Sequence, residues 1–166
     1  KSLIPLPLEL AHQICKRLDK VRSDGTIKGI FSDGKAQVTV QYENGKPVRV
    51  KTIVVSVQHS KDKDLDALRS EIIANVLWPV FEDFPFDKDT EILVNPSGRF
   101  VKGGPAADTG LTGRKIIVDT YGGEGAHGGG AFSGKDPTKV DRSAAYMARC
   151  AAVSVVQNGF ADKCQV

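Results

Sequence analysis

The chain has 166 residues, of which 40% are hydrophobic and 26% are charged. These fractions are typical of a folded globular protein and exclude a wholly disordered chain. The net charge of +3, from 23 basic and 20 acidic residues, is too small to indicate nucleic-acid binding. No apolar run reaches the roughly 18 residues of a membrane span. We therefore expect neither a nucleic-acid nor a membrane partner.

The cysteines and the start of the chain indicate its context. Cys15, Cys150 and Cys164 are odd in number and form no close pair, which favours a reducing, cytoplasmic location over a disulfide framework. The sequence begins at Lys1, and its one methionine is Met147. We therefore expect a processed product or a section of a longer protein.

The N-terminal part predicts a helix followed by a hairpin. Apolar residues recur at helical spacing over 7–21, with charged residues between them, which predicts an amphipathic helix. Apolar and polar residues alternate over 37–42, as in a half-buried strand. The dipeptide Asn44-Gly45 predicts a two-residue turn, and the return strand covers 47–57.

The next elements complete an α+β layout. Apolar residues at helical spacing predict a second helix over 65–80, with Pro79 at its end. A short strand follows at 91–94, and residues 95–98 (NPSG) form a turn in which proline fixes φ and glycine frees it. We expect a mixed or antiparallel sheet with helices packed on one face.

The second half of the chain is rich in glycine. Of the 17 glycines, 12 lie between residues 98 and 134, and this stretch contains one predicted strand, 115–120. A third helix is predicted over 141–157, with a face of small apolar residues that allows close packing. Its candidate caps are Asp141 or Ser143 at the N-terminal end and Asn158-Gly159 at the C-terminal end.

The stretch GGGAFSGKD (128–136) nearly matches a phosphate-binding P-loop. Gly129, Gly134 and Lys135 fit GxxxxGK, but Asp136 stands where a Mg²⁺-binding Ser or Thr belongs, and Pro137 prevents a helix from following directly. We reject a true P-loop and with it an unrelated nucleotide hydrolase. Successive backbone N–H groups beside a lysine still predict an anion cradle.

Charged residues of both signs surround this cradle. Arg114 and Lys115 are adjacent, a pairing of a guanidinium fork with a point charge that suits a polyanion. Seven basic and five acidic residues lie between Arg99 and Arg142. A site that holds several phosphates with Mg²⁺ needs both signs, whereas a solvated surface is the alternative.

Other single residues carry weaker signals. Phe100 follows a turn and could stack on a base, although a core position is the commoner outcome for phenylalanine. His127 lies in a glycine loop, where it could act as an acid or base. We expect structural roles for His12 and His59.

Four longer motifs are much more specific. The second half contains DTGLTGRKIIVDTYGG and GGGAFSGKDPTKVDRSAAY, and the first half contains SDGKAQVTVQY and VVSVQHS. Together they closely resemble the S-adenosylmethionine synthetase family, also called methionine adenosyltransferase. The resemblance covers essentially the whole chain.

The resemblance implies an enzyme that joins ATP and L-methionine. In the family, the methionine sulfur attacks the ribose C5′ of ATP and expels the triphosphate, which the same enzyme hydrolyses to phosphate and diphosphate. Mg²⁺ and K⁺ are the usual ions, and cationic groups stabilise the charge that grows on the leaving group. The family fold has three similar α+β domains. The resemblance further implies a cytoplasmic homodimer or dimer of dimers with the active site between subunits.

The resemblance also implies roles for residues at the nucleoside end of the site. Those that would approach the ribose and the reacting centre are Asp33, Gly34 and Lys35. Those that would bind the nucleotide, with the Phe100 ring against adenine, are Ser97, Gly98, Arg99 and Phe100. Asp108 would contact both the nucleoside and methionine.

Further implied roles concern the triphosphate and the metal. The residues that would grip the triphosphate are Arg114, Lys115, Ala131 and Lys135. Lys139 would contact methionine or phosphate, and Asp141 would serve Mg²⁺. The side chains expected to contribute most to catalysis are Lys35, Arg114, Lys135 and Lys139.

The chain departs from the family in length. It contains neither the HPDK-type motif, whose histidine lies at the reacting centre, nor the GAGDQG-type nucleotide motif. It also stops after the third helix, where the family continues. We therefore expect an internal section: residues 1–102 as the central domain, and 103–166 as the N-terminal part of an incomplete C-terminal domain.

This departure leaves two functions open. The isolated chain is expected to bind phosphates weakly and to catalyse little, because the missing groups supply positioning. The alternative to a section of an active synthetase is a non-catalytic fragment that keeps the fold and an anion- or nucleotide-binding surface.

Overall fold

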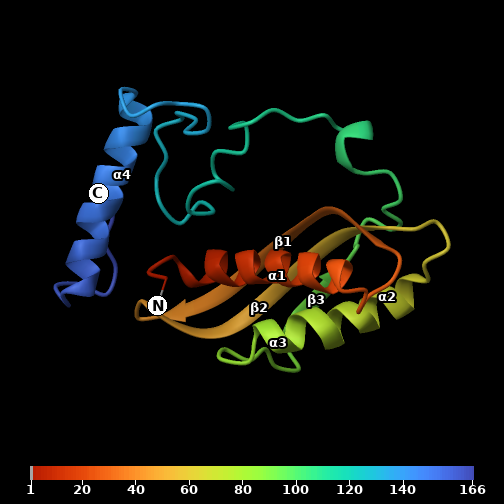
Figure 1. The fold of residues 1–166 in the computed structure, drawn as a ribbon. Helices are drawn as coiled ribbons and strands as arrows, with labels where there is room; N and C mark the ends of the chain where they lie inside the picture. The colour runs from red at the N-terminus through yellow and green to blue at the C-terminus, as the bar shows by residue number, and fades with distance from the viewer. Residues whose placement is uncertain (1) are drawn as a thin grey trace. The chain divides into compact units, whose positions relative to one another are not determined.

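The computed structural model describes residues 2–166, which form two compact units (Figure 1). Residues 6–109 form one, which we name the sheet unit because it contains the β-sheet. Residues 110–166 and the N-terminal residues 2–5 form the other, which we name the glycine-rich unit.

The sheet unit has an α+β architecture. Its elements in chain order are α1 (Leu6–Ser23), β1 (Ile30–Glu43), β2 (Lys46–His59), α2 (Leu65–Ile72), the π-helical η1 (Ile73–Leu77), α3 (Trp78–Val80), β3 (Glu91–Val94) and the 3₁₀ turn η2 (Gly104–Ala106). The strand order is β1-β2-β3; β1 and β2 are antiparallel, and β2 and β3 are parallel. The predicted α+β class is confirmed, and the sheet is mixed because the chain crosses over through α2 and α3 before it reaches β3.

The hairpin forms at the predicted turn. Asn44 and Gly45 adopt φ values of 51° and 77°, the left-handed region that a tight two-residue turn demands. Strand β1 is longer than predicted, because it begins at Ile30, well before the half-buried alternation, whereas β2 exceeds its predicted range by only one residue at its start and two at its end.

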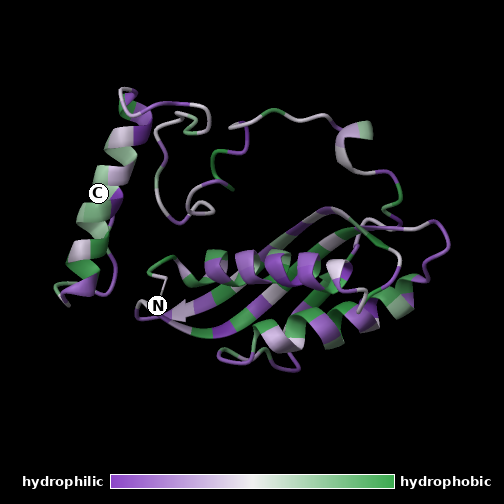
Figure 2. Cartoon of the chain, in the orientation of Figure 1, coloured by the Kyte–Doolittle hydropathy of each residue, from purple (hydrophilic) through white to green (hydrophobic). Residues whose placement is uncertain are grey.

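The hydrophobic core of the sheet unit lies between its helices and one face of the sheet. Helix α1 buries residues three or four positions apart: Leu10, Ile14, Leu18 and Val21. Strand β2 buries every second residue from Ile53 to His59. Figure 2 shows the corresponding hydrophobic and hydrophilic bands along the strands. All 16 buried hydrophobic residues of the described chain lie in this unit.

The second predicted helix is continuous but changes its winding. It begins at Asp64, whose Oδ1 accepts the Ala67 N–H at 2.8 Å, and passes through η1 into α3. Pro79 has no N–H to donate to the carbonyl of Asn75, four residues earlier. The Nε–H of Arg17 on α1 donates to that carbonyl instead, at 2.8 Å.

In the glycine-rich unit, the predicted strand over 115–120 is wrong. This stretch forms consecutive turns, in which the Asp119 N–H donates to the Lys115 carbonyl at 2.8 Å and the Gly122 N–H donates to the Ile117 carbonyl at 3.0 Å. A strand needs a neighbour to satisfy its backbone groups, and the described residues of this unit offer no strand to pair with.

Helix α4 (Val140–Gln157) corresponds to the third predicted helix. Its N-cap is Lys139, which provides no side-chain cap, so the predicted capping by Asp141 or Ser143 is wrong: both already lie in the first turn. The C-terminal prediction is confirmed. Asn158 is the C-cap, Gly159 has φ 75°, and the Phe160 N–H donates to the Val155 carbonyl at 3.1 Å. The helix buries no residue completely.

Two further observations concern the described chain. None of the helices within residues 2–166 combines the length and apolarity that crossing a bilayer takes. Cys15, Cys150 and Cys164 are free thiols. Desolvation raises the pKa of the Cys15 thiol, and a backbone hydrogen bond from Ala36 opposes the rise, so this thiol is less readily ionised than an ordinary one.

Candidate functional site

The candidate residues fall into two groups, one in each unit. The sheet unit holds those expected at the nucleoside end: Asp33, Gly34, Lys35, Ser97, Gly98, Arg99, Phe100 and Asp108. The glycine-rich unit holds those expected at the phosphate end: Arg114, Lys115, Ala131, Lys135, Lys139 and Asp141.

A bulge in β1 places Asp33. Ile30 pairs with His59 and Gly34 pairs with Val57, so residues 31–33 lie opposite Gln58 alone. A Cβ at Gly34 would lie only 3.0 Å from the carbonyl oxygen of Ser56, so the backbone of β2 would have to shift to accept a larger residue there. The bulge brings Oδ2 of Asp33 to 2.7 Å from the Gly104 N–H, which donates to it.

The residues that follow β3 form the turn carrying Ser97 and Gly98. Asn95 is 7% exposed; its Oδ1 accepts the Val57 N–H at 2.8 Å, and its Nδ2 donates to the Val57 carbonyl at 3.0 Å. The side chain thus continues the pairing of β3 with β2. The Gly98 N–H donates to the Asn95 carbonyl at 2.9 Å, and Gly98 has φ 95°, as predicted for this turn.

The end of β2 holds the chain beyond that turn. The His59 N–H donates to the Phe100 carbonyl at 2.9 Å, and the Phe100 N–H donates to His59 Nε2 at 3.0 Å. Gln58 Nε2 donates to the Val101 carbonyl at 3.0 Å. A Cβ at Gly103 would lie 2.8 Å from Gln58 Cδ and 2.9 Å from Asp33 Oδ2, so a larger residue would displace these side chains. Residues 95–104, which we name the clasped segment, are therefore fixed along their length.

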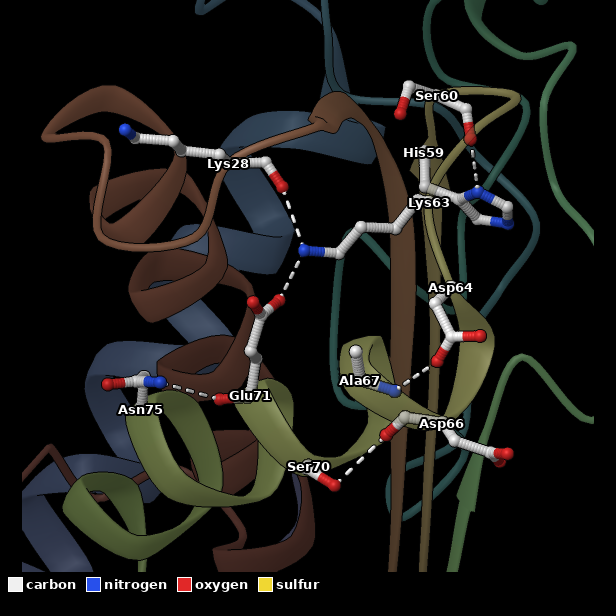
Figure 3. Close-up of polar contacts among 10 residues, drawn as sticks. All are labelled: Lys28, His59, Ser60, Lys63, Asp64, Asp66, Ala67, Ser70, Glu71 and Asn75. Atoms are coloured by element: carbon white, nitrogen blue, oxygen red, sulfur yellow. Dashed lines mark hydrogen bonds and ion pairs between the residues drawn. The ribbon is translucent and has the colours of Figure 1, made fainter.

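Arg99 is engaged with its own unit. Its guanidinium donates to the carbonyls of Lys61 and Lys63. The Lys63 side chain, 12% exposed, donates to the Lys28 carbonyl at 2.9 Å and pairs with Glu71 at 2.5 Å (Figure 3). Arg99 thus joins the clasped segment to a loop that is itself tied to α2.

Sequence reasoning missed part of this arrangement. Gln58, Asn95 and Gly103 were not among the candidates, and His59 was assigned only a structural role. The signal was present in VVSVQHS, where Gln58 and His59 end the strand directly after its valine-rich part. The residues that these two side chains bind lie far away in the sequence: Phe100 is 41 residues from His59, and Val101 is 43 residues from Gln58. Sequence spacing alone therefore did not indicate these contacts.

The glycine-rich unit contains a cavity of about 640 Å³, a size typical of small-molecule sites. Lys115 and Ala131 line it, together with polar side chains that include Asp119, His127 and Arg142. Arg114, Lys135 and Lys139 are not among its lining residues. A Cβ at Gly113 would lie 2.7 Å from Cβ of Ala131, which shows how closely the two glycine loops approach.

Two candidate residues form an ion pair. Lys135 Nζ lies 2.5 Å from Asp141 Oδ2, and the carbonyl of Lys135 accepts a hydrogen bond from Arg142. A Cβ at Gly130 would lie 2.6 Å from Asp141 Oδ1. The predicted phosphate-binding lysine and the predicted metal-binding carboxylate therefore lie together against the loop 128–135.

Asp136, the residue that breaks the P-loop pattern, stabilises the turn before α4. Its Oδ1 accepts the Thr138 hydroxyl at 2.5 Å and the Thr138 N–H at 2.8 Å. These two bonds, the hydroxyl first, hold the pKa of the carboxyl below its ordinary value of 3.8. The turn leads directly to Lys139, whose N–H donates to the Asp136 carbonyl at 3.1 Å.

His127 lies at the cavity wall. Its Nδ1 accepts the Gly129 N–H at 2.8 Å, and its ring stacks on Phe132 with centroids 5.7 Å apart. Its Nε2 is buried without a hydrogen-bond partner. Because protein atoms cover Nε2, this nitrogen offers no contact to a ligand in this arrangement.

The predicted metal ligand Asp141 lies beside the glycine loop, with its Oδ2 paired to Lys135. Within residues 2–166, no group of three or more His, Cys, Asp or Glu side chains gathers as a metal site. Mg²⁺ at phosphate sites is, however, commonly bound by one or two carboxylates together with phosphate oxygens and water. A single carboxylate beside the glycine loop fits that pattern.

Both parts of the chain, residues 1–100 and 102–166, match domains of known proteins. Residues 1–100 match the sequence profile of the S-adenosylmethionine synthetase central domain, and residues 102–166 match that of its C-terminal domain. An S-adenosylmethionine synthase from Desulforudis audaxviator (strain MP104C) is 55% identical over 165 residues, which is 99% of this chain. The chain spans 42% of the length of that relative.

Proposed function

The chain belongs to the S-adenosylmethionine synthetase family, and we propose that it works as the internal section of an enzyme that forms S-adenosylmethionine from ATP and L-methionine. The observation that carries this proposal is the match, in consecutive order, to the central and C-terminal domains of one family. We propose 1–102 and 103–166 as the two domain sections.

The glycine-rich unit would receive the triphosphate. Lys115 and Ala131 both line the cavity, and an ammonium group together with backbone N–H groups suits an anion. Arg114, Lys135 and Lys139 add positive charge in the same unit. Charge builds on the triphosphate as the C–O bond to C5′ breaks, so fixed cations lower the barrier to this step.

Asp141 would hold Mg²⁺, which neutralises phosphate charge when bound; K⁺ is the second ion we propose. The ion pair with Lys135 places this carboxylate beside the glycine loop. Lys135 can exchange Asp141 for a phosphate oxygen once substrate arrives, because an exposed ion pair is weak.

The clasped segment and the β1 bulge would bind the nucleoside and methionine. We propose that Phe100 packs against adenine, that Ser97, Gly98 and Arg99 support it, and that Asp108 contacts the nucleoside and methionine. Asp33, Gly34 and Lys35 would face the ribose. The hydrogen bond from the Gly104 N–H to Asp33, which joins the β1 bulge to the clasped segment, supports this proposal.

Further proposals follow from the family. We propose a cytoplasmic homodimer or dimer of dimers with the active site between subunits. Positioning of both substrates would then depend on groups outside these 166 residues.

The deciding experiment compares the 166-residue chain with a full-length synthetase that contains it. Both are incubated with ATP, methionine, Mg²⁺ and K⁺, and S-adenosylmethionine, phosphate and diphosphate are measured. We expect the full-length protein to form all three products and the isolated chain to form little. A full-length protein that binds ATP yet forms no S-adenosylmethionine would support a non-catalytic, nucleotide-binding role instead.

A further inference from the structure

His59 is a fully buried polar residue at the end of β2, and both of its ring nitrogens are engaged. Nδ1 lies 2.8 Å from the Ser60 carbonyl oxygen (Figure 3), and Nε2 lies 3.0 Å from the Phe100 nitrogen. We propose that His59 is a positioning residue for the nucleotide, acting through the backbone of Phe100. The nucleotide part of this inference rests on the function proposed above.

The two partners determine the state of the ring. The Ser60 carbonyl can only accept a hydrogen bond, so Nδ1 must carry a proton. The Phe100 N–H can only donate, so Nε2 must present a lone pair. Neutral imidazole with its proton on Nδ1 is the one form that satisfies both. The imidazole therefore serves as a specific acceptor and not merely as a space-filling core group.

The resulting connection to Phe100 runs in both directions. The His59 backbone N–H donates to the Phe100 carbonyl at 2.9 Å, while the His59 ring accepts the Phe100 N–H. Phe100 is thus paired with one residue as if in a strand, although its own segment is not one. Only residues 96–99 separate this anchor from the buried side chain of Asn95. The turn that carries Ser97, Gly98 and Arg99 is fixed at both ends.

Fixing Phe100 at its backbone also fixes the point from which its half-buried ring projects. A ring that stacks on adenine must lie within a fraction of an ångström of the right plane, and small displacements of positioning groups cost binding and rate. Loss of the Nε2 acceptor would leave a partly buried N–H unpaired and release the end of the turn. The expected consequence is weaker ATP binding, with little effect on methionine.

Two variants of the full-length synthetase distinguish the effect of losing the hydrogen-bond acceptor at His59 from the effect of altered packing. His59→Gln places Oε1 as many bonds from Cβ as Nε2 of histidine, so it can still accept the Phe100 N–H. His59→Met has similar length without a comparable acceptor. We expect His59→Met to raise the KM for ATP about 10-fold or more, with the KM for methionine changed less than about 2-fold. We expect His59→Gln to restore most of the affinity for ATP.

A readout that does not require catalysis tests the contact itself. Amide hydrogen exchange at Phe100, measured in the 166-residue chain, should accelerate in His59→Met and stay slow in His59→Gln. Imidazole ¹⁵N shifts of the unsubstituted chain should show the proton on Nδ1. Thermal unfolding of both variants reports any general loss of folding.

The outcomes distinguish this inference from the proposed function. Equal exchange at Phe100 in the two variants, or a proton on Nε2, overturns the positioning role of His59. Exchange as expected, with an unchanged KM for ATP in both variants, leaves the contact in place and overturns the assignment of this segment to the nucleotide. Equal losses for both substrates in both variants reduce His59 to a stability role and also overturn the inference.

Discussion

The sheet unit and the glycine-rich unit differ in whether buried side chains support their candidate residues. In the sheet unit, buried side chains such as Asn95 and His59 fix the backbone of the clasped segment. In the glycine-rich unit, none of the described residues is a buried hydrophobic one, and the candidates lie on turns and at the start of α4. The contrast shows that the sheet unit holds its candidate residues by buried contacts, whereas the glycine-rich unit has little core of its own to support its candidates.

The largest expected effect is a loss of unfolding free energy when a core residue is truncated. It tests whether the hydrophobic core is confined to the sheet unit. Ile53 is fully buried on β2, so Ile53→Ala should lower the free energy of unfolding of the 166-residue chain by about 2–5 kcal/mol. Trp78 is the one tryptophan of the chain and packs on Phe86 at 4.6 Å, so its fluorescence during urea unfolding reports this unit.

Met147→Ala is the matched substitution in α4, where the side chain is 70% exposed. We expect it to change the free energy of unfolding by less than about 0.5 kcal/mol, as followed by helical circular dichroism. A loss comparable to that of Ile53→Ala would show that α4 is covered in solution and would remove the contrast between the units.

The next expected effect is a loss of turnover when a lysine of the glycine-rich unit is replaced. Lys135→Ala in a full-length synthetase should lower kcat by at least about 100-fold, as expected when a cation that stabilises leaving-group charge is lost. Steady-state formation of S-adenosylmethionine measures it. Lys102→Ala removes an exposed lysine to which no role is assigned and should leave kcat within about 2-fold; an unchanged kcat in Lys135→Ala would refute the role of Lys135.

A smaller effect tests the rigidity of the clasped segment. Asn95→Ala should lower the free energy of unfolding by about 1–3 kcal/mol more than Asn44→Ala. Both asparagines have positive φ, 46° and 51°, so both variants incur similar backbone strain. Only Asn95 also loses two buried hydrogen bonds to Val57. Equal losses in urea unfolding would mean that the side-chain bonds add nothing to the anchoring of this turn.

The same contrast explains what the sequence could and could not predict. The hairpin at Asn44-Gly45, the helix over 7–21 and the strand over 91–94 were predictable because their partners lie within the same 100 residues. The stretch 115–120 has the composition of a strand, yet it forms turns because the described part of its unit provides no partner. The sequence pattern of a segment indicates its preference for strand structure. Whether the segment forms a strand depends on whether the fold provides another strand to pair with it.

Prediction of the site was limited in a similar way. Motif resemblance predicted site roles for Asp33 and Phe100, and the structure joins their segments to neighbouring ones through Gly104 and His59. The ion pair between Lys135 and Asp141 was not foreseen, although both residues were candidates. A motif assigns a role to one position at a time, whereas contacts between positions depend on how bulges and turns bend the chain.

The smallest expected effect is a change in the pKa of a carboxyl group. It concerns an Asp-x-Thr motif that occurs in both units. Asp24 accepts hydrogen bonds from the hydroxyl and N–H of Thr26, just as Asp136 does from Thr138, and the pKa of each carboxyl is lowered mainly by the threonine hydroxyl. Because the pKa is lower in the folded state, the stabilisation is present above the ordinary value of 3.8 and is lost as the pH falls through the lowered one.

Carboxyl ¹³C titrations by NMR would compare the two motifs in the 166-residue chain. Thr138→Val should raise the pKa of Asp136 toward its ordinary value and leave that of Asp24 unchanged, and Thr26→Val should do the reverse. If Asp24 titrates below 3.8 while Asp136 already titrates at the ordinary value without substitution, then the turn before α4 is not formed in solution. The glycine-rich unit would then differ from the sheet unit not only in its core but also in its local order.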